Sequence, residues 1–157
     1  MKHMIKAILM VFLITVFAVG LFSINAKAES DYIRNLSDKK QASLEDGVIL
    51  VSMLAGNKSI NFAAARAYLI LKKVIAKNIK GSERLTMGSL ATMIMKTKKM
   101  GGGLFFSILG GGRYAYRELV FRRFMRPGRC AAHSVSGGEL LAIITRVSGE
   151  MKIKQKF

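Results

Sequence analysis

The chain has 157 residues, of which 26 are lysine or arginine and nine are aspartate or glutamate, and its formal net charge is +17. This length allows one modest domain, and so strong a positive balance indicates a polyanionic partner: nucleic acid, an anionic lipid surface or an acidic polymer. A single cysteine, Cys130, excludes an internal disulfide framework.

The first 28 residues have the pattern of a secretory signal peptide. Two lysines precede an apolar run, 7–20, and the small-residue motif Ala26-Lys27-Ala28 follows it. This order predicts cleavage after Ala28. The alternative is an uncleaved membrane anchor, because residues 7–24 are at the short end for a spanning helix. We therefore expect a periplasmic or secreted bacterial protein, and export argues against a nucleic-acid partner.

Residues 29–157 would form the mature protein, with 23 basic and nine acidic residues and a net charge of +14. A first helix is predicted from Ser43 to about Gly56, because Ser43-Leu44-Glu45-Asp46 resembles a helix N-cap and an apolar run follows it. One interpretation is that this helix is the remaining half of an earlier repeat unit.

The sequence repeats itself at an offset of fifty residues. Residues 63–75 align with 113–125, and without any gap residues 85–96 then align with 135–146. Two separate segments that agree at one offset indicate a duplication. The equivalent positions include Ala65 and Ala115, Leu69 and Leu119, Leu90 and Leu140, and Lys96 and Arg146.

Each unit is predicted to be helix, loop, helix. The second helices begin after Leu85-Thr86 and Val135-Ser136, and Ser136 with Glu139 matches a capping box. The first helices are predicted to end before Gly81 and before Pro127-Gly128. The apolar runs are too long and alternate too little to be strands. We therefore predict a single all-α domain, 29–157, with repeat 1 at about 61–100 and repeat 2 at about 113–150.

A spacer, residues 101–112 (GGGLFFSILGGG), separates the two units. It is not a phosphate-binding loop, because no G-K-[ST] sequence follows it. We expect a short segment that packs on the core, with glycines allowing a sharp entry and exit. The alternative is an apolar contact with a membrane or a partner protein through Leu104, Phe105, Phe106 and Leu109.

From about residue 63 to 150 this arrangement resembles the S-layer homology module. The resemblance rests on Thr86-Met87-Gly88-Ser89 and Ser136-Gly137-Gly138-Glu139, which correspond to a T-R-A-E-like start of the module's second helix. It implies helical units and attachment to an envelope polymer, which in some members is peptidoglycan. The basic residue that helps members of the family to bind the polymer is replaced here by Met87 and Gly137.

Few side chains of the chain suit catalysis or metal binding. His133 follows Cys130 by three residues, but two ligands do not complete a structural zinc site, which usually has four. No third group is present to orient a Cys–His nucleophile pair, and no two carboxylates share a spacing that suggests acid–base chemistry. We therefore expect no enzymatic activity, metal or cofactor.

The basic residues are the stronger candidates for function, because arginine binds phosphate and carboxylate groups in a bidentate manner. On a helical wheel, Ile70, Leu71, Val74 and Ile75 form an apolar arc, as do Val120, Phe121, Phe124 and Met125 of the second unit. The predicted polyanion-binding residues are Lys72 and Lys73, which project opposite the arc, with Arg113, Arg117, Arg122, Arg123, Arg126 and Arg129. The alternative is a solvated basic face that keeps an apolar protein in solution.

Together these features predict an exported, non-enzymatic envelope protein that binds an anionic component such as peptidoglycan or an acidic polymer. Two alternatives remain. One is a partner-binding subunit of an envelope or surface assembly, and the other is a peripheral protein of the membrane surface.

Overall fold

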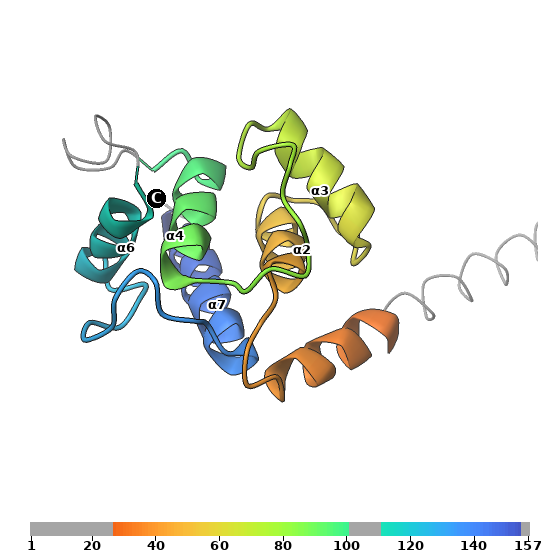
Figure 1. The fold of residues 1–157 in the computed structure, drawn as a ribbon, viewed down its shortest axis with the longest axis horizontal. Coiled ribbons are helices and arrows are strands. Elements are labelled where there is room, and N and C mark those ends of the chain that lie inside the picture. Colours follow the sequence, from red (N-terminus) through yellow and green to blue (C-terminus); the bar gives the residue numbers. More distant parts are fainter. Residues whose placement is uncertain (1–26, 101–110, 155–157) are drawn as a thin grey trace, which may run out of the picture. The chain divides into compact units, whose positions relative to one another are not determined.

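The computed structural model describes residues 27–100 and 111–154, with side chains up to residue 149 (Figure 1). Every regular element in this part of the chain is a helix, which confirms the all-α prediction. Most of the predicted signal peptide and residues 101–110 of the spacer lie outside the described residues. Within the described residues, no helix combines the length and the apolar character that crossing a membrane requires.

Of the described residues, 36–100 and 111–154 belong to one compact unit and 27–35 to a separate one. Residues 27–37 are helical, and the helices that follow are α2 (Leu44–Leu54), α3 (Phe62–Leu71), α4 (Met87–Thr97), α6 (Gly112–Phe121) and α7 (Gly137–Lys154). Helix α3 packs on α2, α6 packs on α4, and α2 also contacts α4 and α7. In Figure 1, α2, α4 and α7 lie between α6 and α3.

Helices α2, α4 and α7 begin at one buried backbone junction. The N–H of Ala42 donates to the carbonyl of Val135 (2.8 Å), that of Val135 to Leu85 (3.1 Å), and that of Leu85 to Ala42 (3.1 Å). All three residues are completely buried. The closed ring of hydrogen bonds provides partners for backbone groups that would otherwise be buried without any. It therefore fixes the starts of the three helices against one another.

The three helices that leave this junction each start with a capping box. Ser43 and Asp46 form the box of α2, and Thr86 and Ser89 form that of α4. In α7, the N–H of Glu139 donates to the Ser136 hydroxyl (3.3 Å), and the N–H of Ser136 donates to the Glu139 carboxylate (3.1 Å). Each box satisfies amide groups that lack partners in the first helical turn. The predicted helix starts are thus confirmed.

The ends of α3 and α6 differ from the prediction. Helix α3 ends at Leu71 and α6 at Phe121, well before Gly81 and Pro127. The predicted ends were wrong because glycine or proline usually follows a helix end, whereas Lys73 and Arg123 occupy these two turns.

Four helices end in the same Schellman turn, in which a left-handed residue follows the C-cap. These left-handed residues are Gly56 after α2, Lys73 after α3, Lys99 after α4 and Arg123 after α6, with φ of 98°, 56°, 48° and 63°. The characteristic hydrogen bonds join the N–H groups of Asn57, Val74, Met100 and Phe124 to the carbonyls of Ser52, Leu69, Met95 and Leu119. Only the first of the four has the usual glycine, which confirms the predicted end of α2 near Gly56.

The early helix ends also overturn the predicted helical wheel. Leu71 and Phe121, expected in the buried arc, are 81% and 84% exposed. The basic pairs after them lie beyond the helices rather than on their outer faces. Val74 and Phe124 are nevertheless buried, because the Schellman turn packs the residue after the left-handed position against the last helical turn.

The segments that contain α3–α4 and α6–α7 correspond closely at an offset of fifty residues. Both ends of α3 and α6, and the first residues of α4 and α7, differ by this number. The aligned pairs Ala65 and Ala115, Leu69 and Leu119, Leu85 and Val135, and Leu90 and Leu140 are all completely buried. The two segments therefore place the same positions in the core, although α7 extends further, to Lys154.

Candidate functional site

A pocket of about 210 Å³ lies between the loop that follows α6 and the first turns of α7. We call it the arginine pocket. It is lined by Met87, Arg126, Arg129, Gly138, Glu139, Ala142, Ile143 and Arg146. Met87 and Ile143 are buried, whereas the three arginines are exposed. The pocket therefore combines an apolar base with cationic groups around its opening.

Hydrogen bonds from both neighbouring helices hold the loop at this pocket. The Tyr116 hydroxyl on α6 donates to the carbonyl of Arg126 (2.9 Å), and Nη1 of Arg146 on α7 donates to the carbonyl of Phe124 (3.3 Å). Nη1 of Arg129 forms an ion pair with Oε1 of Glu139 (2.8 Å). Since these contacts come from two helices of the core, they hold the loop backbone at Phe124 and Arg126 and the side chain of Arg129.

The charges of the arginine pocket do not balance. Three guanidinium groups face one carboxylate, which leaves two positive charges. The Glu139 carboxylate already forms an ion pair with Arg129 and accepts a hydrogen bond from the N–H of Ser136 at the start of α7. Arg146 uses one N–H on a carbonyl, and a guanidinium has five. Among the described residues, the Arg126 side chain has no hydrogen-bond or ion-pair partner. The pocket can therefore bind an anion through Arg126 and Arg146.

The two positions that lack the basic residue of the S-layer homology pattern are both filled by the core. Met87 is only 5% exposed. At Gly137 an added Cβ would lie 1.7 Å from the carbonyl oxygen of Leu36, a distance that excludes any side chain. The positive charge of the arginine pocket therefore comes from Arg126 and Arg129 of the loop and from Arg146 of α7.

The predicted polyanion-binding residues separate into groups. Arg126 and Arg129 both line the arginine pocket, together with Arg146, which was not predicted as a binding residue. Arg113, Arg117, Arg122 and Arg123 are exposed and do not line it. Nε of Arg122 forms an ion pair with Oε1 of Glu118 at 2.8 Å.

Lys72 belongs to a different pocket, of about 180 Å³, which we call the lysine pocket. It is lined by Leu54, Ala55, Lys72, Val74, Lys96, Thr97, Lys98 and Lys99. Lys73 is exposed and does not line it. Burial lowers the pKa of Lys98, because an ammonium group loses hydration when it is partly enclosed.

Arg146 and three of the four lysines of the lysine pocket, Lys96, Lys98 and Lys99, were not among the binding residues predicted from the sequence. A signal existed in the repeat alignment, which superimposes Lys96 on Arg146 and thus retains a basic residue near the end of the second helix. Charge density along the chain could not show it, because each of the two residues meets its pocket partners only through tertiary packing.

Cys130 and His133 are both exposed, and the backbone N–H of His133 donates to the carbonyl of Cys130 at 3.0 Å. In the described parts of the chain, no three histidine, cysteine, aspartate or glutamate side chains lie close enough to hold a metal ion. The apolar candidates Leu104, Phe105, Phe106 and Leu109 lie outside the described residues.

Comparisons of the chain with models of known protein families, with curated proteins and with solved structures find no match.

Proposed function

We propose that this protein is an exported, non-enzymatic component of a bacterial envelope that binds an anionic polymer, with peptidoglycan as the first candidate. The observation that carries the proposal is the arginine pocket, which joins an apolar base to two uncompensated positive charges. In a chain of net charge +17, this pocket brings basic groups from two chain segments, the loop after α6 and helix α7, together around a concave surface.

The chemistry of the pocket suits an acidic sugar or a peptide-substituted sugar. Arg126 and Arg146 can each bind a carboxylate through two parallel hydrogen bonds. Met87 and Ile143 offer apolar contact to a sugar ring face or to an N-acetyl methyl group. Peptidoglycan carries all of these groups, because its acetylated sugars bear short peptides with carboxylates.

The proposal includes a duplicated architecture similar to that of S-layer homology modules. The equal bounds of α3 and α6 and the four pairs of completely buried residues at an offset of fifty support the duplication. In this protein Arg126 and Arg129, in the loop between α6 and α7, would take over the role of the family's basic residue. Positions 87 and 137 cannot expose a basic side chain, because the first is buried and the second has no room for a Cβ.

Co-sedimentation of the protein with purified peptidoglycan sacculi tests this function. It should be carried out at low salt and at about 0.5 M salt, where the Debye length is roughly 4 Å and surface charges are screened. We expect binding that persists at high salt and falls at least roughly tenfold in the double variant Arg126→Gln with Arg146→Gln, because each lost charge-assisted pair weakens the contact.

Arg113→Gln with Arg117→Gln is the matched control, since it removes the same charge from exposed positions on α6. An equal loss of binding in both double variants would show that binding depends only on the total positive charge and not on the arginine pocket. Absence of sedimentation in the unchanged protein at low salt would refute the proposal.

A second candidate function, peripheral attachment to a membrane surface, is favoured by one observation. Leu71 and Phe121 are 81% and 84% exposed, and each is followed directly by two basic residues. An apolar side chain beside cationic groups matches the boundary between anionic headgroups and acyl chains. Flotation with anionic and with neutral vesicles tests it, and Leu71→Ser with Phe121→Ser should abolish any binding to the anionic vesicles.

A further inference from the structure

The lysine pocket lies where three helices end. Leu54 and Ala55 contribute the end of α2, Lys72 and Val74 the end of α3, and residues 96–99 the end of α4. The arginine pocket includes Met87, the first residue of the same helix α4. The two pockets are therefore separated along α4 by its whole length, about 15 Å at the usual rise per residue.

Four lysines and no carboxylate line this second pocket: Lys72, Lys96, Lys98 and Lys99. Lysine near a helix end is ordinary, because the last carbonyls carry a partial negative charge of about half a unit per helix. Three helix ends thus offset about one and a half of the four positive charges. More positive charge is gathered here than helix capping requires.

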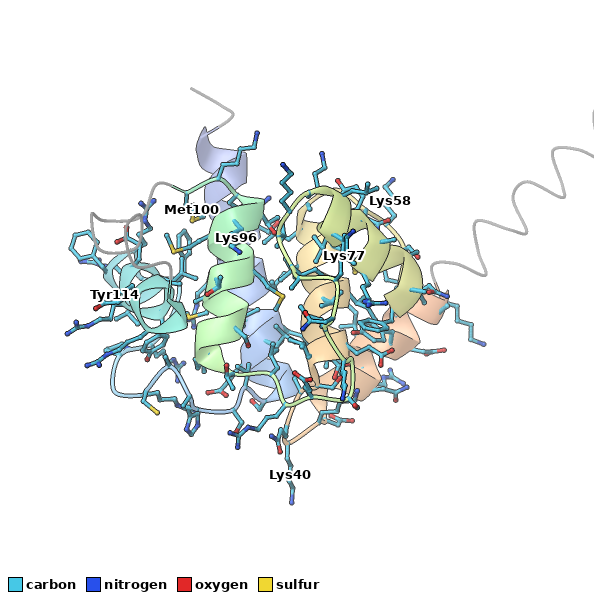
Figure 2. All side chains as sticks on the ribbon, turned by 45° about the horizontal axis from the view of Figure 1, so that its top comes forward. Lys40, Lys58, Lys77, Lys96, Met100 and Tyr114 are labelled. Atoms are coloured by element: carbon cyan, nitrogen blue, oxygen red, sulfur yellow. The ribbon has the colours of Figure 1, made fainter. Side chains whose placement is uncertain are left out.

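Two of the lysines are occupied by contacts within the protein. Nζ of Lys98 donates to the carbonyl of Leu54 (2.7 Å), which closes the end of α2. Nζ of Lys72 lies 5.7 Å from the centre of the Tyr68 ring. Lys96 and Lys99 are exposed, and neither side chain has a hydrogen-bond or ion-pair partner among the described residues. Figure 2 shows Lys96 on α4, away from Lys40, which projects at the lower edge of the view.

The side chain of Thr97 gives this pocket a further feature. Oγ1 of Thr97 is buried and has no hydrogen-bond partner in the described structure, although such groups are nearly always paired. Rotation about the Cα–Cβ bond of Thr97, which lines the pocket, moves its hydroxyl to another staggered position, from which it can donate to an anion in the pocket.

From these observations we infer that the lysine pocket binds a phosphate group with two or more negative charges, such as a phosphomonoester or a pyrophosphate. Ammonium groups act on phosphate as compact point charges without a fixed planar geometry. A compact, multiply charged anion can therefore be held by several of them at once. This site is distinct from the arginine pocket, and it does not depend on the proposed polymer binding.

Titration calorimetry with inorganic pyrophosphate at constant ionic strength tests the inference. The test variant is Lys96→Gln with Lys99→Asn, because asparagine tolerates the left-handed conformation. The matched control is Lys40→Gln with Lys58→Gln, which removes the same charge from exposed positions outside the pocket. We expect the affinity to fall at least roughly tenfold in the test variant and less than about twofold in the control.

Thr97→Val provides a second measurement that does not depend on charge. Removal of a buried hydroxyl without a partner should leave the thermal midpoint unchanged or raise it, whereas pyrophosphate affinity should fall. Equal affinity losses in the lysine test variant and its control, or no measurable heat with the unchanged protein, would overturn the inference. Arg126→Gln with Arg146→Gln should retain full pyrophosphate affinity at the lysine pocket. The phosphate inference and the polymer-binding proposal can therefore be refuted separately.

A soluble compound and a lipid headgroup can both supply such a phosphate. Flotation with vesicles that contain phosphatidic acid, compared with neutral vesicles, distinguishes the two sources. Binding to these vesicles that is lost in Lys96→Gln with Lys99→Asn identifies a lipid phosphomonoester, and pyrophosphate binding without flotation identifies a soluble phosphate. Vesicle binding that persists in the variant would exclude the lipid source for this pocket.

Discussion

The segments α3–α4 and α6–α7 have the same backbone plan and different surface chemistry. Their first helices have equal lengths and end in the same left-handed turn, and their second helices begin at the same junction. Yet the residues aligned with Arg126, Arg129 and Glu139 of the arginine pocket are Ala76, Ile79 and Ser89. The same geometry thus forms a pocket of arginines beside the loop in the α6–α7 segment only.

This difference shows which residues determine the backbone and which determine binding. The positions that the two segments share are buried, and the turn between the helices is held by main-chain hydrogen bonds. Exposed loop residues make few of these contacts, so they can change charge without altering the fold. The loop between the two helices can therefore line a charged pocket in one segment and not in the other.

The largest expected effect concerns the first residue of the second helix, where one segment has Met87 and the other Gly137. Gly137→Ala should destabilise the protein by about 3 kcal/mol or more, because its Cβ would meet the Leu36 carbonyl at 1.7 Å. Gly138→Ala is the control, since its Cβ would meet only Ser37, at 3.8 Å. Urea unfolding of both variants measures the difference. Equal stabilities would show that residues 36–37 do not cover the start of α7.

The capping box of α2 gives a smaller effect with a pH signature. Burial alone would raise the pKa of Asp46, but hydrogen bonds from Lys39 and Ser43 outweigh it, and its pKa is lowered below 3.8. The stabilisation is therefore present above the unfolded pKa and is lost as the pH falls through the lower native value. Asp46→Asn should cost about 2 kcal/mol at neutral pH and less below about pH 3.8.

The box of α4 provides the comparison for this measurement, because its third residue, Ser89, carries no charge. Ser89→Ala should cost about 1 kcal/mol, and this loss should not depend on pH in the acid range. Chemical unfolding of both variants between neutral and acid pH measures the two profiles. If the stability lost in the two variants depended on pH in the same way, the acid-dependent stabilisation would not come from the Asp46 carboxylate.

The smallest effect concerns the left-handed residues at which the two segments agree. Lys73→Gly and Arg123→Gly should each stabilise the protein by about 0.5 kcal/mol, because glycine adopts positive φ without strain but loses more entropy on folding. Lys72→Gly should destabilise it by about the same amount, because its φ of −78° suits any residue. The thermal midpoints of the three variants measure these changes. If all three midpoints moved in the same direction, the strain assigned to the left-handed residues would be contradicted.

The all-α class, the helix starts at Ser43, Thr86 and Ser136 and the end of α2 near Gly56 were predictable from the sequence. These features depend on local rules: apolar spacing at the helical period, hydroxyl and carboxylate residues at caps, and glycine after a helix. Each is encoded within a few neighbouring residues, so that no knowledge of distant contacts is needed.

The ends of α3 and α6, the closed backbone junction and the grouping of basic residues were decided only by the tertiary structure. Lys73 and Arg123 end their helices because burial of Val74 and Phe124 compensates a strained turn that local preference would assign to glycine. Ala42, Leu85 and Val135 meet across more than ninety residues of chain. Arg146 and Lys96 occupy equivalent positions in the sequence alignment but line different pockets. These features depend on how burial and backbone strain balance when distant segments pack together. No short stretch of the sequence contains that information.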